Sequence, residues 1–338
     1  MNFDAPHSRR SGVSKRGKKT RTRFHGMRET FQIRANRKIR KLLYPLYKFF
    51  GIPSVLGLLI PGYRKVTLSP GGHSFEGAYL GGHRDHKIIA TIGDYGSGKI
   101  ESHYVAKMVS DHLANAVVTL GDNVYFETGF QTLVGNFYGD YLRAGAFFPA
   151  TGNHDYSEGR GIALFDRYFD FLGGHRWYSV RFEDVEFFIL DSHQALHHKE
   201  SMKKQREWLE SAATSSDAKW KIAVLHHPPH SARSRSQHEF RFPFGQWGIC
   251  MVMSGHDHTL QHLPIDNVHY VVNGIGGGSI HEFEEILENT EFRLSGSYGA
   301  VFLEVRPDNL GVRFVTVPGN VVHSFDIPAP HVAASPSP

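Results

Sequence analysis

The sequence contains a single cysteine, Cys250, among 338 residues. One cysteine excludes an internal disulfide and a thiolate metal cluster, and it gives no indication of an oxidising compartment. The chain also lacks an internal repeat and a clean apolar run of about 20 residues, the length that a membrane-spanning helix needs. Hydrophobic residues nevertheless make up 40 % of the chain and aromatic residues 13 %, so the composition is that of a globular protein.

Acidic residues are scarce in the N-terminal part of the chain. Up to Lys48 the sequence has 15 Lys and Arg but only Asp4 and Glu29 as acidic residues, and the remaining residues carry a net charge of −8. The sequence therefore predicts a basic arm, residues 1–66, that precedes a mildly acidic body.

The arm ends in an apolar stretch for which the sequence allows several roles. Residues 42–60 are apolar, but Lys48 interrupts them and Pro45 and Pro53 break any continuous helix. The stretch either packs on the body or, with the basic residues, holds residues 1–60 on an anionic membrane surface. Export and nucleic-acid binding are further alternatives, and nucleic acid is the less expected partner. We expect a cytoplasmic or peripheral membrane location, with export left open.

From residue 87 on, apolar strand-like segments alternate with helical ones, which indicates an α/β core. Residues 66–86 are predicted to be a loop with one strand. The predicted strands of the core are 87–92, 116–120, 146–150, 185–190, 220–225 and 249–253. The predicted helices are 99–113, where Ile100, Tyr104, Met108 and Leu113 are the apolar positions, 163–172 and 199–213. Strands alone are predicted afterwards, at 268–272, 298–305, 312–317 and 321–325. The expected domains are a catalytic body, 67–327, and a disordered tail, 328–338.

Five short motifs with metal-binding residues follow predicted strands. They are Asp94-Tyr95-Gly96, Gly121-Asp122-Asn123-Val124-Tyr125, Gly152-Asn153-His154-Asp155, Val224-Leu225-His226-His227 and Gly255-His256-Asp257-His258. In open α/β sheets, ligands bind beyond the carboxyl ends of the strands, so these motifs are expected to meet. Carboxylate oxygens mixed with imidazole favour first-row transition metals, and the number of ligands suits two ions that share a bridging carboxylate.

The order and spelling of the motifs resemble the calcineurin-like metallophosphoesterase superfamily and, within it, the purple acid phosphatases. The resemblance covers most of residues 87–327. It implies a four-layer α/β/β/α sandwich of two mixed sheets flanked by helices, and a metal-dependent hydrolase of phosphoric esters. The form Gly-Asp-x-x-Asp-Arg-Gly of the protein serine/threonine phosphatases is absent after Gly121.

One exchange between two motifs points to iron. Many relatives have Asp-x-His in the first motif, whereas this sequence has Gly96 at the position of the histidine. Tyr125 offers a phenolate oxygen in its place. Phenolate and carboxylate are hard anionic donors that favour a trivalent ion, so the resemblance implies Fe(III) in one position.

The resemblance also implies a ligand set for each ion. For Fe(III) the set is Asp94, Asp122, Tyr125 and His258. For the divalent ion (Fe, Zn or Mn) it is Asp122, Asn153, His226 and His256. His226 is preferred to His227 because His226-His227-Pro228 then fits the family's His-x-Pro. Asp155 and Asp257 are expected to support ligands rather than to bind metal.

The resemblance further implies attack on a phosphate monoester by a metal-bound hydroxide, with a protonated histidine as the acid. His154 is the first candidate for this acid, and His238 and His230 are alternatives. Arg233 and Arg235 are candidates for holding a phosphate, no better supported than a solvated loop. The cluster His193, His197 and His198 is expected to be ordinary surface, and no role is assigned to His103, His112, His262 or His269.

The expected substrate is a phosphorylated small molecule or peptide. One alternative is a phosphodiesterase of the same superfamily. The other is a non-catalytic metal-binding relative that is tethered to a membrane or nucleic acid.

Overall fold

The computed structural model of the protein describes residues 66–69, 72–80, 86–125, 129–157, 161–233 and 236–330. The expectations for the basic arm before residue 66, and for the tail after residue 330, lie outside the described residues. All described residues belong to one compact unit of the chain that begins at Pro61. No helix within these ranges is both long enough and apolar enough to cross a membrane.

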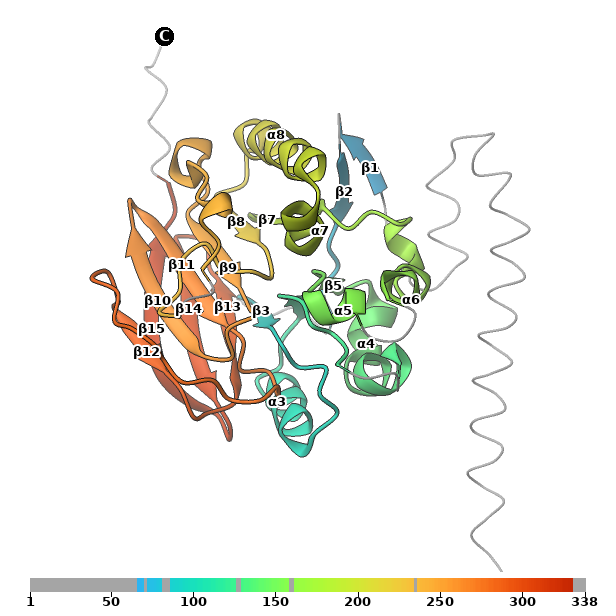
Figure 1. The fold of residues 1–338 in the computed structure, drawn as a ribbon, viewed down its shortest axis with the longest axis vertical. Helices are drawn as coiled ribbons and strands as arrows, with labels where there is room; N and C mark the ends of the chain where they lie inside the picture. Colours follow the sequence, from blue (N-terminus) through green and yellow to red (C-terminus); the bar gives the residue numbers. More distant parts are fainter. Residues whose placement is uncertain are drawn as a thin grey trace, which may run out of the picture. The chain divides into compact units, whose positions relative to one another are not determined.

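Two mixed β-sheets form the centre of this unit (Figure 1). The larger sheet contains, in spatial order, β1 (Val66–Ser69), β2 (Gly72–Glu76), β6 (Tyr178–Phe182), β7 (Val185–Ile189), β8 (Trp220–Val224), β9 (Met251–Ser254), β11 (Val268–Asn273), β10 (Leu260–Ile265) and β12 (Phe292–Leu294). The smaller contains β15 (Asn320–Pro328), β14 (Asn309–Thr316), β13 (Gly299–Val305), β3 (Lys87–Ile92), β4 (Ala116–Thr119) and β5 (Phe147–Pro149). Within the larger sheet β7, β8, β9 and β11 run parallel, and so do β3, β4 and β5 in the smaller one.

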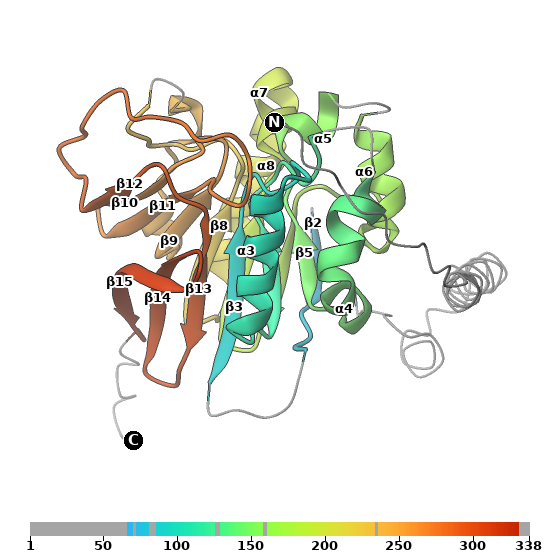
Figure 2. The same cartoon turned by 90° about the horizontal axis from the view of Figure 1, so that it is seen from below.

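Helices cover the outer face of each sheet. The helices are α3 (Ile100–Asp111), α4 (Asn136–Ala144), α5 (Asn153–Ser157), α6 (Ile162–Tyr168), α7 (Ser192–His197) and α8 (Lys199–Ser215). In Figure 2, α3 and α4 lie against the smaller sheet, beside β3 and β5. Helix α8 covers the larger sheet, because its Trp208 and Leu209 pack with Phe188 of β7. The order helix, sheet, sheet, helix confirms the predicted four-layer sandwich.

Adjacent residues of one strand show how the layers divide the core. Phe187 of β7 belongs to the hydrophobic cluster between the two sheets, whereas its neighbour Phe188 belongs to the cluster under α8. Successive side chains of a strand point to opposite faces, so a strand with both faces covered must be apolar throughout. This explains why the central strands appear in the sequence as continuous apolar runs.

Some predicted elements need correction. Residues 66–76 form two strands, β1 and β2, rather than one strand in a loop. The predicted helix 163–172 ends at Tyr168, and a short 3-10 turn (Asp170–Leu172) follows it. Helix α3 is present, but Ile100 and Tyr104, read as part of its apolar pattern, are 54 % and 52 % exposed. Met108, another of the predicted apolar positions, is buried, and Val105 and Val109 are among the other residues of the buried face.

The carboxyl ends of five strands position the loops of the candidate site. β3, β4 and β5 are parallel neighbours in one sheet, and β8 and β9 are parallel neighbours in the other. Their carboxyl ends lead into the loops that carry the five motifs. The sheet topology therefore brings together motifs that lie up to 164 positions apart in the chain, from Asp94 to His258.

Candidate metal centre

Tyr125, Asp94 and His258 meet at the ends of β4, β3 and β9. The Tyr125 hydroxyl lies 3.1 Å from Asp94 Oδ1 and 3.0 Å from His258 Nε2, and these two atoms are 3.2 Å apart. Three donor atoms of different chemistry thus face one another across a triangle with sides of about one hydrogen bond. Asp94 is fully buried and His258 is 8 % exposed, so the triangle is largely shielded from solvent.

A second group of donor atoms surrounds the side chain of Asn153. Its Oδ1 lies 3.0 Å from His226 Nε2 and 3.0 Å from His256 Nδ1. His226 Nε2 is also 3.4 Å from Asp122 Oδ1. One donor atom each from Asp94, Asp122 and His226 lies within 4.8 Å of the other two, which joins the two groups into one site.

Backbone carbonyls fix which histidine nitrogens face the site. Nδ1 of His226 lies 2.8 Å from the Leu120 carbonyl, and Nδ1 of His258 contacts the Ser279 carbonyl. Each Nδ1–H is thereby donated away from the site, and the lone pair of Nε2 is left to face it. The neighbouring His227 has its Nδ1 2.8 Å from Ser192 Oγ, and its ring packs beside that of His256 with centroids 4.5 Å apart, whereas Nε2 of His226 lies among the side chains of Asn153 and Asp122. Of the two adjacent histidines, His226 is therefore the one placed at the site.

Three of the candidate ligands have a left-handed backbone. The φ angles are 57° at Asp94, 53° at Asp122 and 66° at His256. Residues other than glycine adopt this region at an energetic cost, and such strain concentrates at functional sites. Each of the three loops thus turns sharply at the residue whose side chain faces the site.

Gly96 makes room for the loop that carries Tyr125. A Cβ at residue 96 would overlap the Asn123 carbonyl and the Val124 amide nitrogen. In that space the Gly96 N–H donates to the Asp122 carbonyl (3.2 Å), and the Tyr125 N–H donates to the Gly96 carbonyl (2.9 Å). The absence of a side chain at position 96 and the inward position of Tyr125 are therefore parts of the same contact.

The carboxylate of Asp155 connects two of the loops by hydrogen bonds. Its carboxylate accepts hydrogen bonds from the backbone N–H groups of Gly152 (2.8 Å), Asn123 (3.0 Å) and Val124 (3.3 Å), and from Asn123 Nδ2 (2.8 Å). Burial and the charge of Asp122 raise the pKa of Asp155 to about 7, although these hydrogen bonds act in the opposite direction. Asp155 is placed to support the site.

The two buried carboxylates, Asp94 and Asp122, give the site a negative field. Burial raises the pKa of Tyr125 well above its ordinary value, and both carboxylates add to this effect. Burial alone would lower the pKa of His226, but the Asp122 charge raises it to about 10. A cation among these groups would neutralise the field, and oxygen and imidazole donors suit a first-row transition metal. The residues present therefore fit a metal ion.

The candidates for the acid lie in different surroundings. The His154 ring packs against the Tyr125 ring with centroids 4.4 Å apart, and its backbone N–H donates to Asp122 Oδ1 (2.9 Å). His230 instead packs on Tyr270, and His238 is exposed in a 3-10 turn (His238–Phe240). Of the three candidates, His154 is the one in contact with proposed ligands.

Arg233 and Arg235 were the two candidates for binding a phosphate group. Arg233 forms ion pairs with Asp257 (3.4 Å) and Glu284 (3.0 Å), so its charge is already matched by carboxylates. Arg235 lies outside the described residues.

Sequence reasoning did not find His281. Its ring stacks on His258 with centroids 4.1 Å apart and planes 7° apart, and its Nδ1 accepts from the His258 N–H (3.2 Å). The residue lies in an irregular segment after β11, without a motif to mark it. Nothing in the local sequence separates it from the other histidines.

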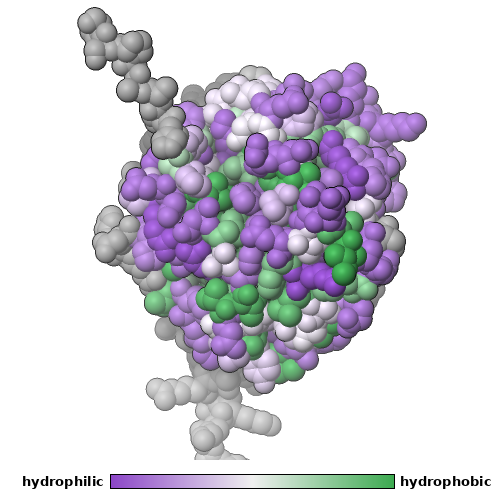
Figure 3. Space-filling view, turned by 90° about the vertical axis from the view of Figure 1, so that its left-hand side faces the viewer, coloured by the Kyte–Doolittle hydropathy of each residue, from purple (hydrophilic) through white to green (hydrophobic). Residues whose placement is uncertain are grey.

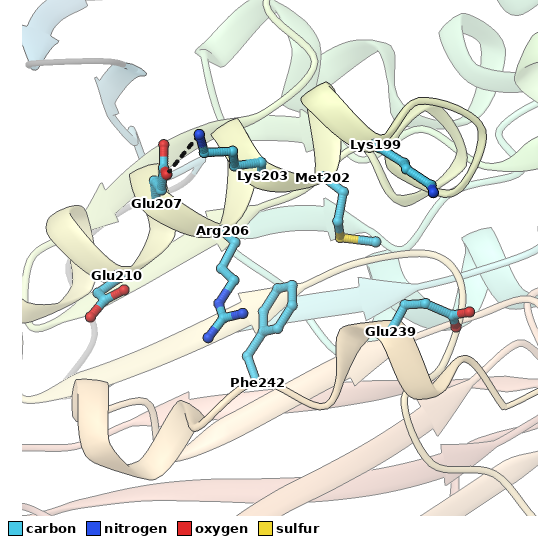
Figure 4. Close-up of a pocket in the computed structure, with 8 residues that line it drawn as sticks. All are labelled: Lys199, Met202, Lys203, Arg206, Glu207, Glu210, Glu239 and Phe242. Carbon is cyan, nitrogen blue, oxygen red and sulfur yellow. Dashed lines mark ion pairs between the residues drawn. The ribbon is translucent and has the colours of Figure 1, made fainter.

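A surface groove of the body lies apart from these groups. It runs between α8 and the segment that contains Phe242, and charged side chains line most of it (Figure 4). Lys203 and Glu207 form an ion pair of 3.9 Å on its rim. None of the candidate ligands lines the groove, so it adds nothing to the candidate centre.

A two-sheet α/β/β/α sandwich, with side chains that could hold a metal ion on the loops after its parallel strands, is the arrangement of the metallophosphoesterases. The family model of the calcineurin-like phosphoesterases matches residues 79–260, more than half of the chain, and the chain belongs to this family. Its similarity within the family is to purple acid phosphatases.

Two related sequences are plant enzymes. Purple acid phosphatase 4 of Arabidopsis thaliana is 23 % identical over 249 residues, which cover 63 % of this chain and 73 % of the relative. Purple acid phosphatase 17 of the same plant is 25 % identical over 227 residues, covering 55 % and 67 %.

Two solved structures share the fold. Purple acid phosphatase PPD1 from yellow lupin (Lupinus luteus) seeds has a TM-score of 0.59 at 18 % identity, with 76 % of this chain and 56 % of that chain covered. GAP50, described as the anchor in the inner membrane complex of Plasmodium, has a TM-score of 0.60 at 18 % identity, with 72 % and 89 % covered.

Proposed function

We propose that the protein is a dinuclear-metal hydrolase of phosphate monoesters, similar in activity to an acid phosphatase. The observation that carries the proposal is the position of the Tyr125 hydroxyl, 3.1 Å from Asp94 Oδ1 and 3.0 Å from His258 Nε2, beside a glycine at residue 96. A phenolate oxygen next to a carboxylate favours a trivalent ion. The similarity to two purple acid phosphatases supports the same reading.

Two sets of side chains would hold the ions, with Asp122 common to both. Asp94, Asp122, Tyr125 and His258 would bind Fe(III), and Asp122, Asn153, His226 and His256 would bind a divalent ion. When bound, the ions would draw negative charge from the phosphoryl group and make hydroxide available from water in mild acid. The chain itself contributes fixed ligand orientation, through the carbonyls of Leu120 and Ser279.

His154 would give a proton to the leaving alkoxide. Its fixed backbone and its ring contact with Tyr125 place it beside the ligands, whereas His230 and His238 contact other parts of the protein. An alkyl alcohol is a poor leaving group and needs this proton, but para-nitrophenolate departs without it.

The leaving-group dependence tests this role. We expect His154→Ala to lower kcat for an alkyl phosphate by roughly 100-fold, and kcat for para-nitrophenyl phosphate much less. His230→Ala and His238→Ala are the matched controls and should change neither substrate selectively. Equal losses for both substrates in His154→Ala would show that His154 is not the acid.

The proposed substrate class has its own test. Turnover of para-nitrophenyl phosphate is expected to exceed that of bis-para-nitrophenyl phosphate. Faster turnover of the diester would favour a phosphodiesterase over a monoesterase.

A second candidate function is attachment to a membrane surface, with or without turnover. The net charge of +13 up to Lys48 favours it, and one protein of the same fold is described as a membrane-complex anchor. The full chain should sediment with vesicles containing phosphatidylserine at low salt, and a chain without residues 1–66 should not. If the full chain stays in the supernatant, this candidate is excluded.

A further inference from the structure

A second group of metal-binding side chains lies outside the candidate centre, where the edges of the two sheets meet. It consists of His262 on β10, His269 on β11, His323 on β15 and Glu291, the residue before β12. β12 is the last strand of the larger sheet and β15 the last strand of the smaller one. Figure 3 views the side of the molecule on which these strands lie in Figure 1, and hydrophilic residues dominate it between several separate hydrophobic areas.

Three donor atoms of this group point at one another. His262 Nδ1 lies 3.0 Å from His323 Nε2 and 3.8 Å from Glu291 Oε2, and all three atoms lie within 4.8 Å of each other. A tetrahedral zinc ion with bonds of about 2.0–2.1 Å holds its ligand atoms about 3.4 Å apart. The two separations from His262 Nδ1, 3.0 and 3.8 Å, lie on either side of this value, so small side-chain movements are enough to enclose an ion.

The histidines are in the protonation state that a metal needs. Burial lowers the pKa of His262 to about 3, and His269 and His323 act in the same direction. Burial also lowers the pKa of His323, although the Glu291 charge opposes it. Imidazole binds metal in its neutral form, and burial favours that form at both histidines.

The Glu291 carboxylate faces the three histidines of the group. It lies 3.8 Å from His262 Nδ1, and its charge opposes the burial that lowers the pKa of His269 and His323. The backbone fixes its position, because the Glu291 N–H donates to the His262 carbonyl (3.0 Å). The Glu291 side chain is 49 % exposed while that of His262 is fully buried, so an ion can enter from the side of Glu291.

Neighbouring rings hold the histidines in place. His262 stacks on Phe325 with centroids 4.0 Å apart, and His323 stacks on Phe292 at 4.6 Å. The second nitrogen of His262, Nε2, lies 2.9 Å from His269 Nδ1 and can donate its proton there. A hydrogen bond of this kind is what orients a metal-binding imidazole and raises its basicity.

We propose that His262, His323 and Glu291 bind a divalent transition metal, with zinc the best match to two imidazoles and one carboxylate, and that His269 orients His262. The ion ties β10 and the residue before β12, in one sheet, to β15 in the other. Three protein ligands leave a fourth position for water. The site is independent of the candidate catalytic centre, with which it shares no ligand.

Zinc binding to the full chain tests the site. The protein is stripped with a chelator, dialysed and titrated with Zn²⁺ alone, and zinc per chain and affinity are measured by elemental analysis and calorimetry. The variants are Glu291→Gln and His323→Ala, both at partly or fully exposed positions. His103→Ala, an exposed histidine on α3, is the matched control.

We expect each of the two variants to bind one zinc ion fewer per chain than the wild type and the control, or to bind it at least tenfold more weakly. The rise in thermal midpoint on adding Zn²⁺ should shrink in the same two proteins. Hydrolysis of para-nitrophenyl phosphate should stay unchanged in them, which separates this site from the catalytic centre. Unchanged zinc number and affinity in either variant would overturn the three-ligand assignment, and the imidazoles would then be a hydrogen-bonded chain only.

Discussion

Replacing Tyr125 with Phe removes one oxygen and keeps the ring that packs on His154. If the phenolate binds Fe(III), concentrated wild-type protein absorbs visible light through phenolate-to-iron charge transfer, and Tyr125→Phe loses this band. We expect kcat to fall roughly 100-fold or more, because even outer partners of metal ligands are worth 10–100-fold. Tyr104→Phe, at an exposed tyrosine of α3, is the control. A colourless wild type would exclude the iron assignment.

A side chain introduced at Gly96 is expected to clash with the neighbouring loop. Gly96→Ala places a Cβ against the backbone of Asn123 and Val124, which cannot move without displacing Tyr125. We expect a loss of about 1–3 kcal/mol in the free energy of unfolding, as in other overpacked sites, together with weaker metal binding. Gly139→Ala in α4 meets only the end of the Arg143 side chain and should be neutral or stabilising. Chemical denaturation of both variants measures the difference.

Single elements depend on a few buried polar side chains. Gln205 of α8 accepts from the Asp191 N–H (2.9 Å) and donates to the Asp191 carbonyl (3.0 Å), which attaches α8 to the end of β7. Gln205→Ala leaves the buried Asp191 N–H without its partner, whereas the Asp191 carbonyl still accepts from the Ala195 N–H (3.1 Å). The expected cost is about 1–3 kcal/mol. Gln246→Ala, at an exposed glutamine, should change the free energy of unfolding by less than about 0.5 kcal/mol. Equal urea midpoints for the two variants would contradict this.

The burial of His262 on β10, beside His323 of β15, predicts a pH dependence of stability. The pKa of His262 is about 3 in the folded protein and about 6.5 when unfolded. The unfolded chain therefore takes up the proton first as pH falls, so this contribution is complete above pH 6.5 and is lost progressively towards pH 3. With a chelator present, wild type should lose about 2–3 kcal/mol more than His262→Phe between pH 7 and pH 4.5. Parallel pH profiles of the two proteins would contradict the prediction.

The elements that the sequence predicts best are the strands that are buried on both faces. β3, β4 and β8 are covered on both faces, and their continuous apolar runs made them visible. Helix α4 was not predicted, because Gly139 and a non-helical backbone at Tyr138 interrupt its pattern. In α3 the predicted apolar position Met108 is buried, but Ile100 and Tyr104 are exposed, because no sequence pattern states which face a sheet will cover.

For the molecule as a whole, bound metal should contribute to stability. An ion that binds only the folded chain stabilises it by about 2.7 kcal/mol at a concentration of 100 Kd. We therefore expect dialysis against a chelator to lower the thermal midpoint and abolish hydrolysis, and added Fe and Zn ions to restore both. Calorimetric scans before and after dialysis measure the effect. A midpoint that does not respond to the chelator would mean that no stabilising ion was bound.

For the molecule as a whole, some features of the candidate site can be predicted from the sequence and others cannot. The motifs name side chains of the right chemistry, and parallel strand order is enough to bring them to one edge of the sheets. The resemblance to His-x-Pro favours His226 over His227, but the contacts that orient the two rings, with the Leu120 carbonyl and with Ser192, come from distant parts of the chain and cannot be predicted from the sequence. Nor does it reveal His281 or the histidines at the sheet edges, whose neighbours are far away in the chain.

The close approach at Gly96 also restricts how this centre can change over time. A histidine at position 96, as in the commoner Asp-x-His arrangement, would run into the strand-end loop that delivers Tyr125. One substitution therefore cannot convert one arrangement into the other, since the loop of residues 121–125 has to retreat in the same step. The residue at position 96 and the position of Tyr125 are therefore coupled through backbone packing.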